Sequence, residues 1–153
     1  MEMRPLNKRG VTLIELIVVI VIIGILGAFL APNIGAWLPN YRLRGAARDI
    51  VSTMRTAQMR AVSTNLIYEV SFTIPKNYIL KYQNTLGAWI NEGTTQTLPS
   101  GVSITTTTLP GQNAVFNPNS TSSSGSVTLQ NSKGTQRRLT LTPSTGRVTI
   151  TTP

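Results

Sequence analysis

The chain has 153 residues, no cysteine, no histidine, 14 basic and five acidic residues, and a formal net charge of +9. That length accommodates one small domain plus an anchor. Without cysteine or histidine the chain forms no disulfide and lacks the commonest general base and metal ligand. The five acids are too scattered to suggest a carboxylate pair or a calcium loop. The inventory argues against an enzyme, and we expect no catalytic residue, metal site or cofactor.

The N-terminal segment combines a basic leader with a long apolar run. Residues 1–10, MEMRPLNKRG, end in glycine, whereas an ordinary secretory signal ends its apolar stretch at a small-residue cleavage site. Residues 11–31 follow with Glu15 as their only charge. As a helix they would extend about 30 Å, the hydrocarbon thickness of a bilayer. We expect a single-pass transmembrane helix, and a generic membrane-tethered binding domain is the plainest interpretation.

A sequence motif at the start of this run favours a more specific interpretation. Gly10 followed by Val-Thr-Leu-Ile-Glu-Leu resembles the processing site of type IV prepilins and type II secretion pseudopilins. The resemblance implies that a prepilin peptidase cuts after Gly10, that Val11 becomes a methylated N-terminus, and that the helix is retained. The family has glutamate at the fifth mature position, here Glu15, and a helix-bending proline, here Pro32. Val11 departs from the phenylalanine usual in the family.

Glu15 has a physical explanation if the chain is cut. A lone carboxylate in hydrocarbon costs a few kcal/mol and usually has a partner or a function. If Val11 begins the mature chain, its α-amine is a cation at the same depth. The resemblance implies that Glu15 neutralises this amine, or that of a neighbouring subunit, during filament assembly. The alternative is that Glu15 lies near the headgroups and has no role.

Residues 32–64 are expected to continue the helix beyond the membrane as an amphipathic rod. Pro32 removes one backbone hydrogen bond and is predicted to bend the helix. An apolar stripe recurs at three- and four-residue steps, and we expect the C-terminal sheet to pack on it. The stripe consists of Leu43, Ala46, Ile50, Met54, Ala57 and Ala61. Arg44, Arg48 and Arg55 lie on other faces of the helix. A solvated face is favoured over a ligand site for the five arginines of this segment, Arg42, Arg44, Arg48, Arg55 and Arg60.

Residues 65–153 are predicted to form a β-rich globular domain, because the apolar period changes to two. Expected strands cover residues 68–74, 78–82, 102–106, 126–130, 138–141 and 147–150. Turns are expected at 75–77, 131–134 and 143–146. The predicted fold is α+β, a long N-terminal amphipathic and transmembrane helix packed on a C-terminal antiparallel sheet. No family resemblance covers residues 83–125, and the polar segment Gly111–Gly125 is predicted to be a mobile loop.

The C-terminal sequence narrows the resemblance. A strand soon after the long helix, followed by GSVTLQNSKGTQRRLTLTPSTGRVTI, resembles the GspH/FimT branch of minor pilins and pseudopilins. Gly146-Arg147-Val148 matches the element that ends the sheet in that branch. The resemblance implies a subunit of a type II secretion pseudopilus or of a type IV pilus, and leaves the choice open. Implied partners are the prepilin peptidase, other pilin or pseudopilin subunits and exported substrate. The implied location is the bacterial inner membrane, with the C-terminal domain in the periplasm.

DNA binding is a second possibility within the same branch. FimT-like members that bind DNA for uptake carry Gly-Arg-x-Arg, whereas Thr149 stands here in place of the second arginine. Basic residues of the last two hairpins could still hold phosphates without reading sequence. They are Lys133, Arg137, Arg138 and Arg147. No aromatic residue is interleaved with them, so base stacking is not indicated. Both DNA binding and an ordinary solvated charge set remain open.

Overall fold

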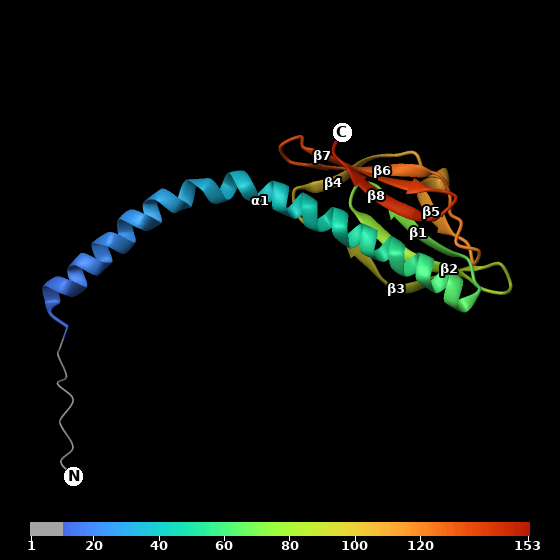
Figure 1. Cartoon of the computed structure of the whole chain (residues 1–153), viewed down its shortest axis with the longest axis horizontal. Helices are drawn as coiled ribbons and strands as arrows, with labels where there is room; N and C mark the ends of the chain where they lie inside the picture. The colour runs from blue at the N-terminus through green and yellow to red at the C-terminus, as the bar shows by residue number, and fades with distance from the viewer. Residues whose placement is uncertain (1–10) are drawn as a thin grey trace, which may run out of the picture. The chain divides into compact units, whose positions relative to one another are not determined.

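The computed structural model describes residues 11–153, except for the side chains of residues 28–34 and 36. One helix, α1 (Leu13–Thr64), precedes all the strands (Figure 1). The chain divides into two compact units, of which the first ends at Trp37 and the second runs from Leu38 to Pro153. The strand-bearing unit therefore includes the last 27 residues of α1, Leu38–Thr64.

The strands of the second unit form two antiparallel four-stranded sheets. One sheet has the order β3-β2-β1-β5 and the other β4-β6-β7-β8. The first contains β1 (Tyr68–Thr73), β2 (Asn77–Gln83), β3 (Trp89–Thr97) and β5 (Asn113–Phe116). The second contains β4 (Val102–Thr107), β6 (Gly125–Asn131), β7 (Gln136–Thr142) and β8 (Arg147–Thr151). A short 3₁₀ turn, η1 (Pro110–Gln112), leads into β5.

The core lies between α1 and the inner faces of the two sheets. All six side chains of the predicted helix stripe are at most 2% exposed, which confirms that this stripe packs on the sheets. Alternate residues of β1, such as Tyr68, Val70 and Phe72, are buried with them. The expected α+β fold, a helix packed on antiparallel sheets, is thereby confirmed. Every buried apolar side chain of the described residues lies between Leu43 and Val148, so residues 38–153 bury a complete core of their own.

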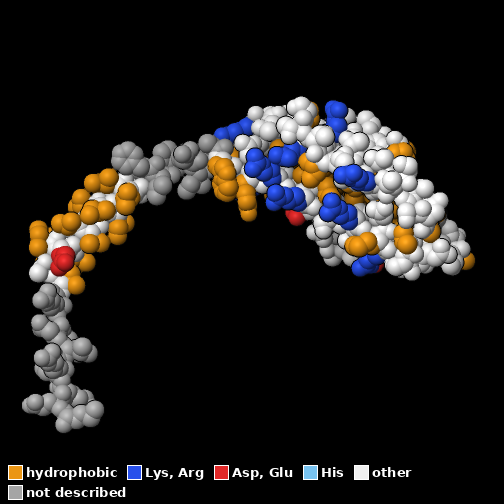
Figure 2. Space-filling model, viewed as in Figure 1, with side chains coloured by type: hydrophobic (Ala, Val, Ile, Leu, Met, Phe, Trp, Pro, Cys, Tyr) orange, Lys and Arg blue, Asp and Glu red, His pale blue; other side chains and the backbone are white. Residues whose placement is uncertain are grey.

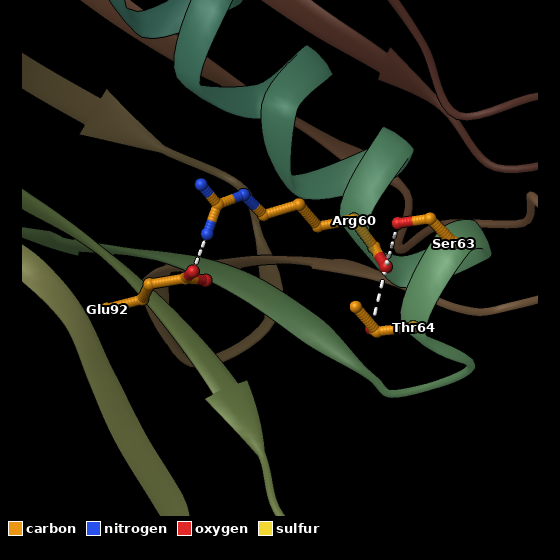
Figure 3. A network of polar contacts seen from close by, with 4 residues as sticks. All are labelled: Arg60, Ser63, Thr64 and Glu92. Carbon is orange, nitrogen blue, oxygen red and sulfur yellow. Dashed lines mark hydrogen bonds and ion pairs between the residues drawn. The ribbon is translucent and has the colours of Figure 1, made fainter.

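Polar contacts connect the helix to both sheets. Gln58 donates to the Thr145 carbonyl (2.8 Å), and Asn131 donates to the Asn40 side chain (2.8 Å). Near the C-terminus of α1, the Arg60 guanidinium pairs with Glu92 of β3 (Figure 3). The Thr64 hydroxyl donates to the Arg60 carbonyl at 2.7 Å, and the Ser63 hydroxyl does so at 3.2 Å. Both hydroxyls bond back to a carbonyl of the preceding turn, the local contact that serine and threonine make within helices.

The middle of the chain corrects one prediction. Residues 83–125 contain three complete strands, β3, β4 and β5, of which only β4 was predicted, and the predicted loop Gly111–Gly125 contains all of β5. Ala114 and Phe116 of β5 are completely buried, and β5 pairs with β1. A bridge between Phe116 and Ser122 holds the following segment against the strand. The prediction of a mobile loop over 111–125 is therefore wrong, because two apolar residues anchor a polar segment.

Glu69 is a charged residue within the first sheet. It points away from the core residues of β1, yet it is only 3% exposed. It lies opposite Lys81 of β2, with Nζ and Oε1 3.7 Å apart. Burial raises the pKa of the Glu69 carboxyl above its ordinary value, although the charge and hydrogen bond of Lys81 act in the opposite direction. Ionisation of Glu69 is therefore less favourable in the folded chain than in the unfolded chain.

Replacing this carboxylate is expected to stabilise the domain at neutral pH. As pH rises through 4.5 toward the raised pKa, the unfolded chain releases its proton first, so stability falls over that window. Glu69→Gln should raise the free energy of unfolding at pH 7 and have little effect below pH 4.5. Urea unfolding at both pH values measures this, with Asp49→Asn, at an exposed carboxylate, as the control. Destabilisation at pH 7 that is absent below pH 4.5 would show instead that the contact of the ionised carboxylate with Lys81 dominates.

Candidate functional site

The described residues of the first unit form an apolar helical surface. From Val11 to Leu26 every large hydrophobic side chain is between 47% and 76% exposed. Figure 2 shows these side chains around a single acidic group. Since apolar residues cover every face of the helix, this segment has no side suited to water. It is suited to a lipid or a bundle of like helices.

Glu15 forms a capping box with Thr12 at the start of α1. The Glu15 amide donates to the Thr12 hydroxyl at 3.3 Å, and the Thr12 amide donates to the Glu15 carboxylate at 3.5 Å. Thr12 immediately precedes the first helical residue, so these bonds satisfy two amides that the first turn leaves unpaired. The Thr-x-x-Glu spacing of residues 12–15 is the sequence signature of a capping box. Glu15 therefore has a helix-capping contact before any role in assembly is considered.

Other N-terminal predictions are less completely described. Gly10 and the leader 1–10 lie outside the described residues, and Val11 lies at their edge as an exposed residue. Pro32 lies within α1, but its side chain is outside the description, and the bend expected there stays a prediction. Within the part of the chain that was described, no helix is both long enough and apolar enough to cross a membrane.

The basic residues of the last two hairpins do not form one cluster. Arg138 pairs with Thr151 and Arg147 with Thr142, so both are exposed on one face of the second sheet but at opposite ends of the β7–β8 pair. Four residues of strand separate them by about 13 Å. Arg137 faces the opposite side by strand alternation, and Lys133 lies in the β6–β7 turn. These residues are close in the sequence, but the strand pleat and the register of the hairpins place them apart in the folded domain.

The arginines of α1 lie on the same unit as the strands. Figure 2 shows basic side chains gathered on the face that carries this part of α1. Arg44, Arg48 and Arg55 are exposed, as expected for a solvated helix face. Arg42 is held in place, because its guanidinium donates to the carbonyl and hydroxyl oxygens of Ser100 at 3.2 and 3.1 Å. In residues 11–153 the ion pairs are Arg60–Glu92 and Lys81–Glu69, neither of which involves these four arginines.

The described residues offer no arrangement for metal chemistry. Among them, no three or more His, Cys, Asp or Glu residues lie close enough to hold a metal ion. The features that stand out are an apolar helix with a capped acidic start and a basic globular unit. A long apolar helix that continues into antiparallel sheets is the arrangement of a pilin-like subunit.

Comparisons with known proteins identify the family. A model of the prokaryotic N-terminal methylation motif matches residues 5–31, and the model of type II transport protein GspH matches residues 46–146. The chain belongs to the GspH family. It is a minor pseudopilin or minor pilin, a membrane-anchored structural subunit that is incorporated into a pseudopilus or pilus. No match was found among curated protein sequences.

Solved structures share the fold. The minor pseudopilin EpsH from the type 2 secretion system of Vibrio cholerae has 11% identity and a TM-score of 0.63, covering 73% of this chain and 98% of EpsH. The type IV minor pilin FimU of Pseudomonas aeruginosa has 14% identity and a TM-score of 0.59, covering 73% of this chain and 90% of FimU. At these identities the likeness supports the pilin-like fold alone.

Proposed function

We propose that this chain is a minor pseudopilin of a type II secretion system, made as a prepilin and cut after Gly10. The observation that carries the proposal is the N-terminal methylation motif over residues 5–31, which includes Gly10 and Glu15, joined to a GspH domain. Prepilin peptidase cuts on the cytoplasmic side and Val11 is methylated. Residues 11–31 span the inner membrane once, and the strand-bearing unit lies in the periplasm.

The role proposed is structural rather than catalytic. The exposed apolar surface of Val11–Leu26 is favourable in lipid, where its burial contributes about 25 cal/mol per Å². Extraction into a filament requires that other pilin or pseudopilin helices cover the same surface. The helix is therefore the assembly element, and the strand-bearing unit is what the filament presents to neighbouring subunits or to exported substrate.

The N-terminus of the mature protein tests this function. We expect mass spectrometry of the full chain, purified from membranes of cells that contain the peptidase, to find N-methylated Val11 as the first residue. A Gly10→Val variant should retain residues 1–10, while a matched Asn7→Val variant should be cut normally. An intact Met1 in the parent chain would overturn the proposal in favour of a generic membrane tether.

A second candidate role is DNA binding by the C-terminal hairpins of a FimT-like minor pilin. It is favoured by the exposure of Arg138 and Arg147 on one face of the second sheet. If this face holds phosphates, the affinity of residues 38–153 for duplex DNA should fall steeply with salt. Arg138→Ala with Arg147→Ala should reduce affinity by about tenfold or more. Arg44→Ala with Arg48→Ala removes the same charge elsewhere and serves as the control in a fluorescence anisotropy titration. Binding that is absent or insensitive to salt would contradict this role.

A further inference from the structure

A cavity of about 400 Å³ opens beside α1 at the start of the strand-bearing unit. Three arginines line it, Arg42, Arg44 and Arg48, together with Tyr41 and Pro99. Its volume is within the range of small-ligand pockets in proteins. Asp49 is the one acidic residue in the lining, so the side chains around the cavity carry a net charge of two positive units. Such a cavity is suited to an anion.

The arginines are available to such an anion. Arg44 and Arg48 are separated by one helical turn and lie on the same face of α1, where both are exposed. Arg42 is already oriented by its two bonds to Ser100, so less conformational entropy is lost when it binds a ligand. Arginine is the side chain best matched to phosphate, because its planar fork donates two parallel hydrogen bonds.

Gly45 is an independent sign that the cavity is kept open. It lies in the middle of α1, where glycine costs about 0.5–1 kcal/mol relative to alanine. A Cβ atom at this position would meet no other atom within 4 Å, so packing does not require glycine here. Gly45 also lines the cavity. The missing side chain leaves the helix backbone accessible between two arginines, where a ligand can approach it closely.

We propose that this cavity binds the phosphate headgroup of an anionic phospholipid, holding the strand-bearing unit to the membrane before assembly. The inference rests on the proposed function, in which residues 11–31 cross the membrane. Arg42 follows Ala31 by eleven residues, so even a fully extended chain keeps it within about 40 Å of the end of that segment. Tyr41 is 58% exposed in the cavity lining, and Trp37, four residues earlier, is 61% exposed. Tryptophan and tyrosine are the residues that both membrane interfaces favour, and arginines beside them attract anionic lipid headgroups.

Asp49 favours a lipid headgroup over free phosphate. A carboxylate in the lining repels a bare phosphate ion, but it accepts hydrogen bonds from hydroxyl groups. The headgroup of phosphatidylglycerol has both a phosphodiester and free hydroxyls. Three arginines and one carboxylate therefore match this headgroup better than inorganic phosphate, and better than the lone carboxylate of a protein side chain.

Vesicle binding by residues 38–153 tests the proposal without the membrane segment, which keeps it separate from the test of cleavage. This unit is used because it buries its own core. In co-sedimentation, we expect it to bind phosphatidylcholine vesicles containing phosphatidylglycerol and not pure phosphatidylcholine vesicles. Arg44→Gln with Arg48→Gln should weaken binding about thirtyfold. Arg138→Gln with Arg147→Gln removes the same charge and should change affinity by less than threefold.

A variant without charge change separates the cavity from general attraction. Gly45→Leu projects a side chain into the open space and should weaken vesicle binding at least tenfold, with a thermal midpoint no lower than that of the parent. Equal losses in both arginine pairs would overturn the proposal, since they would reflect the overall charge of the unit. Saturable binding of inorganic phosphate without preference for phosphatidylglycerol, or tighter binding to duplex DNA or acidic peptide through the same arginines, would overturn the assignment to lipid.

Discussion

Glu15→Ala is expected to leave cleavage after Gly10 intact and to reduce incorporation of the subunit into filaments by at least tenfold. The expectation follows from the charge that cleavage creates, an α-amine on Val11 four residues before the carboxylate. In a low-dielectric bundle an unpaired amine is far more costly than one facing a carboxylate. Cleavage should be unaffected, because the substitution leaves Gly10 and Val11 in place. Filaments sheared from cells and quantified by immunoblot, beside the cut and uncut chain in membranes, measure both effects.

The capping box provides a competing explanation that two matched variants resolve. Glu15 accepts a hydrogen bond from the Thr12 amide, and Thr12 accepts one from the Glu15 amide. Glu15→Gln keeps this capping ability but removes the charge, whereas Thr12→Ala keeps the charge and removes a cap contributing about 0.5–2 kcal/mol. If charge pairing drives assembly, Glu15→Gln should be as defective as Glu15→Ala, and Thr12→Ala should assemble well.

The opposite pattern would contradict the pairing role. Normal assembly of Glu15→Gln together with a defect in Thr12→Ala would mean that Glu15 acts by starting the helix. Normal assembly of all three variants would mean that the carboxylate lies near the headgroups without a function. Loss of cleavage in Glu15→Ala would mean that Glu15 acts in recognition by the peptidase rather than in filament assembly.

The helix and the C-terminal hairpins were predictable because their signals are local and periodic. The stripe from Leu43 to Ala61 repeats over five turns, and all of its residues are buried. The turn at Asn131–Gly134 is stabilised by local hydrogen bonds, since the Asn131 side chain accepts bonds from the Lys133 and Thr135 amides at 3.0 Å. Patterns of this kind are readable without knowledge of the tertiary contacts.

Strands β3 and β5 could not be predicted, for two different reasons. Eight of the nine residues of β3 are exposed, so no alternation of apolar and polar residues marks a strand that lies at the sheet edge. β5 is four residues long, and the segments that flank it, 110–112 and 117–124, consist of Pro, Gly, Gln, Asn, Ser and Thr. Its conformation comes from pairing with β1, about 45 residues earlier in the chain. The intrinsic strand propensity of the residues has less influence on their conformation than such long-range contacts have.

The candidate sites also fall into two groups: one that a local sequence pattern predicts, and others that depend on contacts between distant segments. The Thr12–Glu15 capping box belongs to the first group, because its three-residue spacing can be recognised in the sequence. The separation of Arg138 from Arg147 follows from the register of β7 and β8, which no local pattern specifies. The cavity at Gly45 needs Pro99, which comes from the connection between β3 and β4, to lie against α1. Contacts between distant segments are what a single sequence leaves open.

Phe116→Ala is expected to lower the free energy of unfolding of residues 38–153 by about 3–5 kcal/mol. Phe116 is 0% exposed and lies opposite Tyr68 in the β1–β5 pair, so truncation leaves a cavity between α1 and the first sheet. Small domains have only about 5–15 kcal/mol of stability, so this loss is a large share of the total. Urea unfolding followed by far-ultraviolet circular dichroism measures it.

Leu86→Ala is the control, because that leucine is 90% exposed and its truncation should change stability by less than about 0.5 kcal/mol. A loss below about 1 kcal/mol for Phe116→Ala would mean that β5 contributes little to the core. The segment 111–125 would then behave as the mobile loop that its composition suggests. A loss in the expected range makes one phenylalanine the reason that a polar, Ser- and Asn-rich segment is ordered: the burial of its ring outweighs the local preference for a loop.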